Sequence, residues 1–126
     1  MEKVAESSAE YTKTRGYRDL LVWQKSITLV TEVYELTKTF PREEIYGLQN
    51  QMRRAAVSVP SNIAEGQARE KSADFSRFLR ISLGSLAEID TQVEIAKRLS
   101  YIGVERAQQI ENLTIEIRRM LFGLLN

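Results

Sequence analysis

Apolar residues recur every three or four positions through most of this chain, and this spacing constrains the fold more than any other feature. One such stripe begins with Leu20 and Trp23, and others follow it as far as the C-terminus. Residues spaced in this way share one face of an α-helix. The pattern is interrupted near Pro41, Gly66 and Gly103. The sequence therefore predicts four helical segments.

The ends of these segments carry recognisable signals. Asp19 is the predicted N-cap of the first segment, which ends before Pro41 because the residue preceding a proline avoids helical angles. The second segment covers about residues 43–64, with Gly66 as its stop. Ser72 is the predicted N-cap of the third segment, which is on the order of 40 Å long at about 1.5 Å per residue.

Four helices on a chain of 126 residues predict an all-α fold, an antiparallel up-down four-helix bundle forming one domain over residues 17–126. Residues 1–16 are polar and lack an apolar period, so we expect a flexible N-terminal tail. The chain has no cysteine, which excludes disulfides and fits a cytoplasmic protein. No run reaches the roughly 18 apolar residues of a membrane span, and no signal peptide is recognisable. We therefore expect no membrane partner.

Residues 51–66 place a proline inside a helical pattern. Pro60 lacks an N–H donor and its ring crowds the carbonyl four residues earlier, so we predict that the second helix is kinked near it. Asn62 and Glu65 lie close to Pro60 and Gly66. We interpret them as structural residues that satisfy backbone or arginine donors there. The alternative is a ligand pocket at this junction.

Four sequence blocks resemble one known family. They are residues 17–24 (YRDLLVWQ), 59–66 (VPSNIAEG), 75–79 (FSRFL) and 84–88 (GSLAE). In this order they resemble the bacterial 23S rRNA intervening-sequence proteins, from about Tyr17 to the C-terminus. The resemblance implies a four-helix bundle. The family name records a genomic location, within insertions in ribosomal RNA genes, and implies no activity.

The resemblance also implies an assembly. Related intervening-sequence proteins, and the similar accessory variability proteins of diversity-generating retroelements, form ring-like pentamers. The resemblance therefore implies a homo-oligomer, with a pentamer as the expected count.

Two of the four helices carry more apolar surface than one bundle core requires. A bundle helix needs an apolar sector of about 100°, whereas the third segment has a second stripe that includes Phe78, Ile81, Ile95 and Leu99. We expect these four residues to contact identical subunits. In the alternative, the third helix is central and covered on two sides within one subunit. Gly84 is predicted to let two helices approach closely.

The charge of the chain is nearly balanced. Its formal net charge of +1 does not by itself indicate a polyanion partner. Residues 42–80 hold seven basic and five acidic residues, a local net charge of +2. One interpretation is a solvated surface with intrahelical ion pairs. The other is a nucleic-acid site at one end of the bundle, formed by Arg53, Arg54, Arg69, Lys71, Arg77 and Arg80.

Enzymatic arrangements are largely excluded by composition. Without histidine, neither a Ser-His-Asp triad nor a histidine metal site can form. The six glycines stand alone, so no phosphate-binding glycine-rich loop exists. Asp90 and Glu94 share a helix face near Glu88, and we interpret them as surface charges paired with Lys97 and Arg98. We expect no catalytic residue, no metal and no cofactor.

Two functional hypotheses remain open. The leading hypothesis is a non-enzymatic oligomeric protein that binds structured nucleic acid, RNA or DNA, through a repeated basic patch. The alternative is a protein-interaction scaffold or accessory subunit, for example of a reverse transcriptase, for which nucleic-acid contact is secondary. A continuous basic rim would favour the first hypothesis, and an exposed apolar groove the second.

Overall fold

The structure, a computed structural model, describes residues 16–69 and 71–126. The described part contains no strand, and it confirms the all-α four-helix bundle. Apart from Gly16, the predicted tail lies outside the described residues. The elements are the 3-10 turns η2 (Gly16–Asp19) and η3 (Arg42–Glu44) and the helices α2 (Leu21–Thr37), α3 (Leu48–Ala68), α4 (Ser72–Arg98) and α5 (Val104–Leu125).

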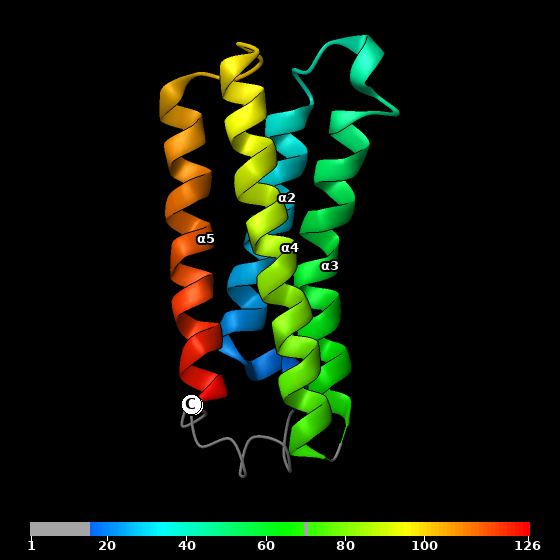
Figure 1. Cartoon of the computed structure of the whole chain (residues 1–126), viewed down its shortest axis with the longest axis vertical. Coiled ribbons are helices and arrows are strands. Elements are labelled where there is room, and N and C mark those ends of the chain that lie inside the picture. The colour runs from blue at the N-terminus through cyan, green and yellow to red at the C-terminus, as the bar shows by residue number, and fades with distance from the viewer. Residues whose placement is uncertain (1–15, 70) are drawn as a thin grey trace.

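The four helices stand side by side in one bundle (Figure 1). The colour of the ribbon shows the chain rising through α2, descending through α3, rising through α4 and descending through α5. α3 packs against α2 and α4, and α5 packs against α4 and α2. Each helix therefore lies beside its sequence neighbours, and α5 closes the bundle against α2. Within the described residues, no helix is long and apolar enough to cross a membrane.

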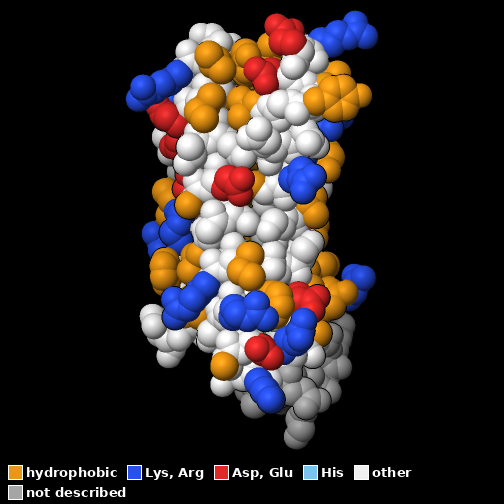
Figure 2. All heavy atoms as spheres, turned by 45° about the vertical axis from the view of Figure 1, so that its right-hand side comes forward, with side chains coloured by type: hydrophobic (Ala, Val, Ile, Leu, Met, Phe, Trp, Pro, Cys, Tyr) orange, Lys and Arg blue, Asp and Glu red, His pale blue; other side chains and the backbone are white. Residues whose placement is uncertain are grey.

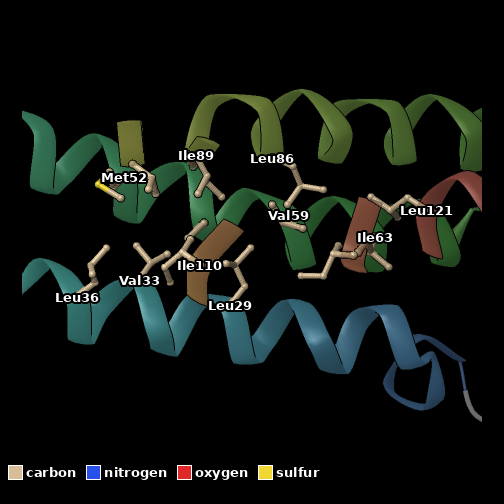
Figure 3. Packing of buried hydrophobic residues seen from close by; sticks show 14 of the residues in the cluster. Leu29, Val33, Leu36, Met52, Val59, Ile63, Leu86, Ile89, Ile110 and Leu121 are labelled. Atoms are coloured by element: carbon tan, nitrogen blue, oxygen red, sulfur yellow. The ribbon is translucent and has the colours of Figure 1, made fainter. Parts of the chain in front are cut away.

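The core lies along the axis of the bundle and receives side chains from all four helices. Figure 3 shows these side chains converging between the helices. They occur at intervals of three, four and seven within each helix, as the spacing predicts. The labelled core residues are Leu29, Val33 and Leu36 of α2, Met52, Val59 and Ile63 of α3, Leu86 and Ile89 of α4, and Ile110 and Leu121 of α5.

Both predicted N-caps are wrong by one residue. α2 begins at Leu21 with Leu20 as its N-cap, because Asp19 belongs to η2. α4 begins at Ser72 itself, and its N-cap is Lys71. Neither N-cap residue makes a side-chain capping bond. Leu20 is only 6% exposed and belongs to the core, so burial of an apolar side chain takes precedence over capping at the start of α2.

The second predicted helix is displaced toward the C-terminus. η3 occupies part of the predicted range, and α3 begins only at Leu48, whose N–H donates to Glu44 Oε1 at 2.9 Å. α3 then continues past Gly66, which is buried within it and is not its stop. A Cβ on Gly66 would lie 2.9 Å from the Cβ of Phe78. Gly66 therefore serves the close approach of α3 and α4.

Pro60 is buried inside α3, which is continuous on both sides of it. The kink near Pro60 stays a prediction. Beside the proline, Ser82 Oγ of α4 donates to the Val59 carbonyl at 2.9 Å. A polar group from the neighbouring helix thus contacts the backbone of α3 at the residue before the proline.

The third helix ends in a left-handed residue. Ser100 has φ of 63°. The N–H of Ser100 donates to the Lys97 carbonyl, and the N–H of Tyr101 donates to the Ala96 carbonyl. These two bonds form a Schellman motif, which satisfies the last carbonyls of a helix. Gly103 then serves as the N-cap of α5.

Candidate nucleic-acid interface

The six basic residues predicted to bind nucleic acid fall into two groups. Arg53 and Arg54 lie in the second turn of α3. At about 1.5 Å per residue, the remainder of α3 separates them by roughly 20 Å from the other group. The other group surrounds the connection from α3 to α4, and we call it the basic end; it consists of Arg69, Lys71, Arg77 and Arg80.

Arg53 is engaged within the subunit. Its Nε donates to Thr37 Oγ1 at 2.8 Å, and its Nη2 donates to the Tyr34 carbonyl at 3.3 Å. Its Cζ also lies 4.4 Å from the centroid of the Tyr34 ring. Arg53 therefore fastens α3 to the last turn of α2. Arg54 is exposed and has no hydrogen bond or ion pair with another described residue.

At the basic end, two arginines lie over one aromatic ring. Arg77 Cζ lies 4.5 Å from the centroid of the Phe78 ring, and Arg69 Cζ lies 5.1 Å from it. Arg69 Nη2 also forms an ion pair with Glu65 Oε2 at 2.7 Å. We call Arg69, Arg77 and Phe78 the Phe78 cluster. The ring of Phe78 is partly exposed, and both arginines are exposed.

The position of Phe78 depends on the absence of a side chain at Gly66. A Cβ at Gly66 would lie 2.9 Å from the Phe78 Cβ and 3.3 Å from the Phe75 carbonyl oxygen. Real Cβ atoms do not approach other atoms so closely without a shift of the neighbour. Gly66 is therefore the residue that allows α4 to place the Phe78 cluster against the end of α3.

Most of the positive charge at the basic end has no acidic partner among the described residues. Lys71, Arg77 and Arg80 form no ion pair with an acidic residue of the described part. Figure 2 shows Lys and Arg side chains gathered over the lower part of this face, with a few acidic side chains among them. Glu65 is paired with Arg69, and Asp74 lies in the first turn of α4. This surface has the charge needed to attract a polyanion.

A polar seam joins α3 to α4 above the Phe78 cluster. Asn62 Nδ2 donates to the Ser58 carbonyl at 2.8 Å and contacts Ser58 Oγ at 3.0 Å. Ser58 Oγ lies 2.8 Å from Ser85 Oγ of α4. Asn62 thus acts as a donor, not as the acceptor that the sequence suggested, and Glu65 accepts from Arg69. Both residues have structural partners within the described part.

The outer face of α4 is not covered by the other described helices of the subunit. Ile81, Ile95 and Leu99 are 41%, 43% and 51% exposed, so the alternative in which the subunit itself covers this stripe is wrong for these residues. Gly84 is also exposed, and no atom lies within 4 Å of a Cβ placed on it. The prediction that Gly84 permits close helix packing is therefore wrong within one subunit.

The carboxylates on α4 are held in ion pairs. Glu94 pairs with Arg98 at 2.8 Å and with Lys97 at 3.2 Å. The hydrogen bonds from Arg98 and Lys97 lower the pKa of Glu94 below its ordinary value. Asp90 accepts from Thr114 Oγ1 and pairs with Arg118, which joins α4 to α5. Within the described part, no group of three metal-ligating residues is placed to hold a metal ion.

Two further clusters of side chains were not predicted from the sequence. Glu44, Leu48 and Tyr101 are joined by hydrogen bonds at the opposite end of the bundle. Near η2, Arg18 Cζ lies 5.8 Å and 5.6 Å from the ring centroids of Tyr17 and Trp23. Tyr17 and Trp23 pack against the core. Glu44 and Tyr101 are 57 positions apart, so local spacing offers no signal for their hydrogen bond.

This geometry defines the class of protein. The chain is a four-helix bundle with a basic end and an exposed apolar helix face. The chain belongs to the 23S rRNA-intervening sequence protein family, which matches residues 18–123. The resemblance seen in the sequence is thus confirmed. Neither the fold nor the family name states an activity.

One solved structure supports the same assignment. The chain is similar to a protein of unknown function from the S23 ribosomal protein family of Bacteroides thetaiotaomicron, with 25% identity and a TM-score of 0.76. The match covers 84% of this chain and 99% of that protein. A comparison with curated proteins found no match.

Proposed function

We propose that this protein is a non-enzymatic oligomeric protein of the cytoplasm that binds structured RNA through its basic end. The observation that carries the proposal is the group of three exposed cations, Lys71, Arg77 and Arg80, that have no acidic partner in the described part of the chain. Unpaired cations on a surface are available to neutralise phosphates, and each such contact releases condensed counterions.

Oligomerisation would strengthen the binding of RNA by the small basic end. One basic end supplies only a few phosphate contacts, but identical copies held in a ring act together on one RNA. The exposed Ile81, Ile95 and Leu99 on α4 are the proposed subunit contact, and a pentamer is the count that the family resemblance implies. The basic ends would then repeat around the assembly.

The test is a binding titration with structured ribosomal RNA fragments over a series of salt concentrations. We expect log Kobs to fall linearly with log salt, with a slope of about −0.7 to −0.9 per phosphate contact. The double variant Arg77→Gln/Arg80→Gln should flatten this slope. The matched control is Arg42→Gln/Arg106→Gln, which removes two exposed arginines from η3 and the first turn of α5.

Two results would overturn the proposal. One is the absence of binding at low salt to any structured RNA or to duplex DNA. The other is binding that responds equally to the double variant and to its control. Light scattering on each variant shows whether the assembly is retained, so a loss of binding through dissociation is recognised.

The exposed apolar face of α4 supports a second candidate function. If Ile81, Ile95 and Leu99 bind a different protein, the chain is a scaffold or accessory subunit, for example of a reverse transcriptase. This function predicts a monomer in isolation and no salt-dependent binding of RNA. The titration and the light scattering together separate the two functions.

A further inference from the structure

We propose that the Phe78 cluster binds an unpaired nucleotide, so that the basic end selects single-stranded loops in RNA over continuous duplex. This inference rests on the proposed function and names the part of the RNA that the site recognises. It depends on three features of the cluster: the guanidinium groups over the Phe78 ring, their restraint before binding, and the neighbouring cations that have no acidic partner in the described part.

The first feature is the geometry of the arginines. The Cζ atoms of Arg77 and Arg69 lie 4.5 Å and 5.1 Å from the centroid of the Phe78 ring. A guanidinium group that lies over an aromatic ring and remains exposed can also contact a second planar group. Proteins bind unstacked bases on guanidinium planes and on aromatic rings. Because both arginines are exposed and the ring is partly exposed, a base can reach this cluster.

The second feature is restraint. The Glu65 carboxylate holds Arg69 in a 2.7 Å ion pair, and the Phe78 Cβ lies so close to Gly66 that a side chain there would contact it. Long side chains normally lose conformational freedom when they bind, and that loss weakens affinity. In this cluster part of the freedom is already lost in the free protein. The exposed Arg54, which has no partner in the described part, lacks such restraint.

The third feature is the distribution of charge. Lys71 and Arg80 belong to the same end of the bundle and have no acidic partner in the described part. They are available for the phosphates on either side of a stacked base. A continuous duplex offers phosphates, but its bases are stacked inside the helix. A duplex would therefore contact the cations but not the Phe78 cluster. We expect the site to favour an unpaired nucleotide.

The sequence predicted that Phe78 contacts another subunit. We instead assign Phe78 to the nucleotide site. A purely structural role, in which the arginines only cover the ring, predicts changes in stability without changes in selectivity. The two roles are therefore distinguished by comparing RNA forms, not by comparing affinities for a single RNA.

The experiment uses the full chain and fluorescence anisotropy at low salt. The RNA probes are a hairpin with an unpaired loop and a fully paired duplex with the same number of phosphates. We expect the hairpin to bind more tightly. Phe78→Leu should weaken hairpin binding by about 5- to 150-fold, the range for the loss of one base stack, and should leave duplex binding unchanged. Phe78→Tyr should retain the preference.

A second variant keeps the proposal testable if Phe78→Leu does not fold. Arg77→Lys keeps the positive charge but removes the planar guanidinium group, so it should reduce the preference for the hairpin while the salt slope stays the same. Tyr46→Leu is the control, since Tyr46 is 92% exposed and lies next to η3, at the other end of the bundle. Single-stranded DNA of the loop sequence should respond to Phe78→Leu in the same way, because stacking does not require the 2′-hydroxyl.

The outcomes separate this inference from the proposed function. If neither RNA binds at low salt, the proposed function fails. If both RNAs bind with a steep salt dependence, equal affinity and no response to Phe78→Leu or Arg77→Lys, the proposed function survives and this inference is wrong. A loss of binding to both RNAs in Arg77→Lys would also contradict it, since the charge is retained.

Discussion

The hydroxyl group of Tyr101 donates a hydrogen bond of 2.8 Å to Glu44 Oε2, across 57 positions of sequence. The other oxygen of Glu44 accepts the backbone N–H of Leu48 at 2.9 Å. The ring of Tyr101 also lies 5.3 Å from that of Phe40, centroid to centroid. One carboxylate therefore joins η3, the start of α3 and the connection from α4 to α5.

This relationship predicts how stability depends on pH. The hydrogen bond from the Leu48 N–H, and then that from Tyr101, lower the pKa of Glu44 below its ordinary value of 4.5. A carboxyl with a lowered folded-state pKa contributes stability above its ordinary pKa, and the contribution is lost as the pH falls through the lowered value. We expect Tyr101→Phe to lower the melting temperature at neutral pH. The difference from the wild type should shrink as the pH falls from about 6 to about 3.

The hydrogen bond between Tyr101 and Glu44 also makes the stability depend on pH in the alkaline range. The Glu44 carboxylate raises the pKa of Tyr101 above its ordinary value of 10.0 because it accepts a hydrogen bond from the phenolic O–H group. On the alkaline side, the stability from this bond is therefore retained up to the ordinary value of 10.0 and is lost as the pH rises through the raised pKa. Tyr46→Phe is the control, since that tyrosine is almost fully exposed. A melting difference for Tyr101→Phe that is constant across the whole pH range would contradict the prediction.

Asn62 and Glu65 should differ in their effect on stability, although the sequence suggested equal roles. Asn62→Ala removes partly buried hydrogen bonds to Ser58, and we expect it to lower the free energy of unfolding by about 0.5 to 1.5 kcal/mol. Glu65→Ala removes an exposed ion pair with Arg69, and its cost should stay below about 1 kcal/mol. Urea unfolding measures both. Equal losses would show that Glu65 has a buried role that its geometry does not suggest.

The sequence predicted the number of helices and the breaks near Pro41 and Gly103, because apolar spacing and helix-breaking residues are local signals. It misread Gly66 for a physical reason. A glycine that ends a helix and a glycine that admits a neighbouring helix look alike in sequence, and the choice depends on Phe78, twelve positions later.

The candidate site was predictable in its residue types but not in its arrangement. The sequence singled out the basic residues by charge alone. It could not show that Arg53 is bound to Thr37 and Tyr34, or that Arg69 and Arg77 lie over one ring. Such contacts depend on how α3 lies against its neighbours in the bundle, which no local pattern records.

Gly66→Ala tests the close approach of α3 and α4. The added methyl group would lie 2.9 Å from Phe78 Cβ and 3.3 Å from the Phe75 carbonyl. Overpacking of this kind costs about 1 to 3 kcal/mol, and it outweighs the gain of up to about 1 kcal/mol from replacing glycine in a helix. Gly123→Ala in α5 is the control, because a Cβ added at Gly123 would meet no described atom within 4 Å apart from its chain neighbours and the backbone of its own helix. Denaturant unfolding should show a lower free energy of unfolding for Gly66→Ala and no loss for Gly123→Ala. An unchanged free energy of unfolding for Gly66→Ala would show that α3 and α4 can move apart at little cost.

The proposed assembly depends on the outer face of α4. Native mass spectrometry should report a discrete oligomer well above the 14.5 kDa of one chain. Ile81→Glu and Ile95→Glu place a charge on residues that are 41% and 43% exposed in the subunit. Burying that charge between copies is unfavourable, so each variant should dissociate the oligomer while the helical circular dichroism of the subunit persists.

The control is Val104→Glu, at a residue that is 71% exposed in the first turn of α5. This variant should leave the oligomer intact. A monodisperse wild-type monomer at tens of micromolar would contradict the assembly, and equal dissociation by all three variants would place the contact elsewhere than on α4.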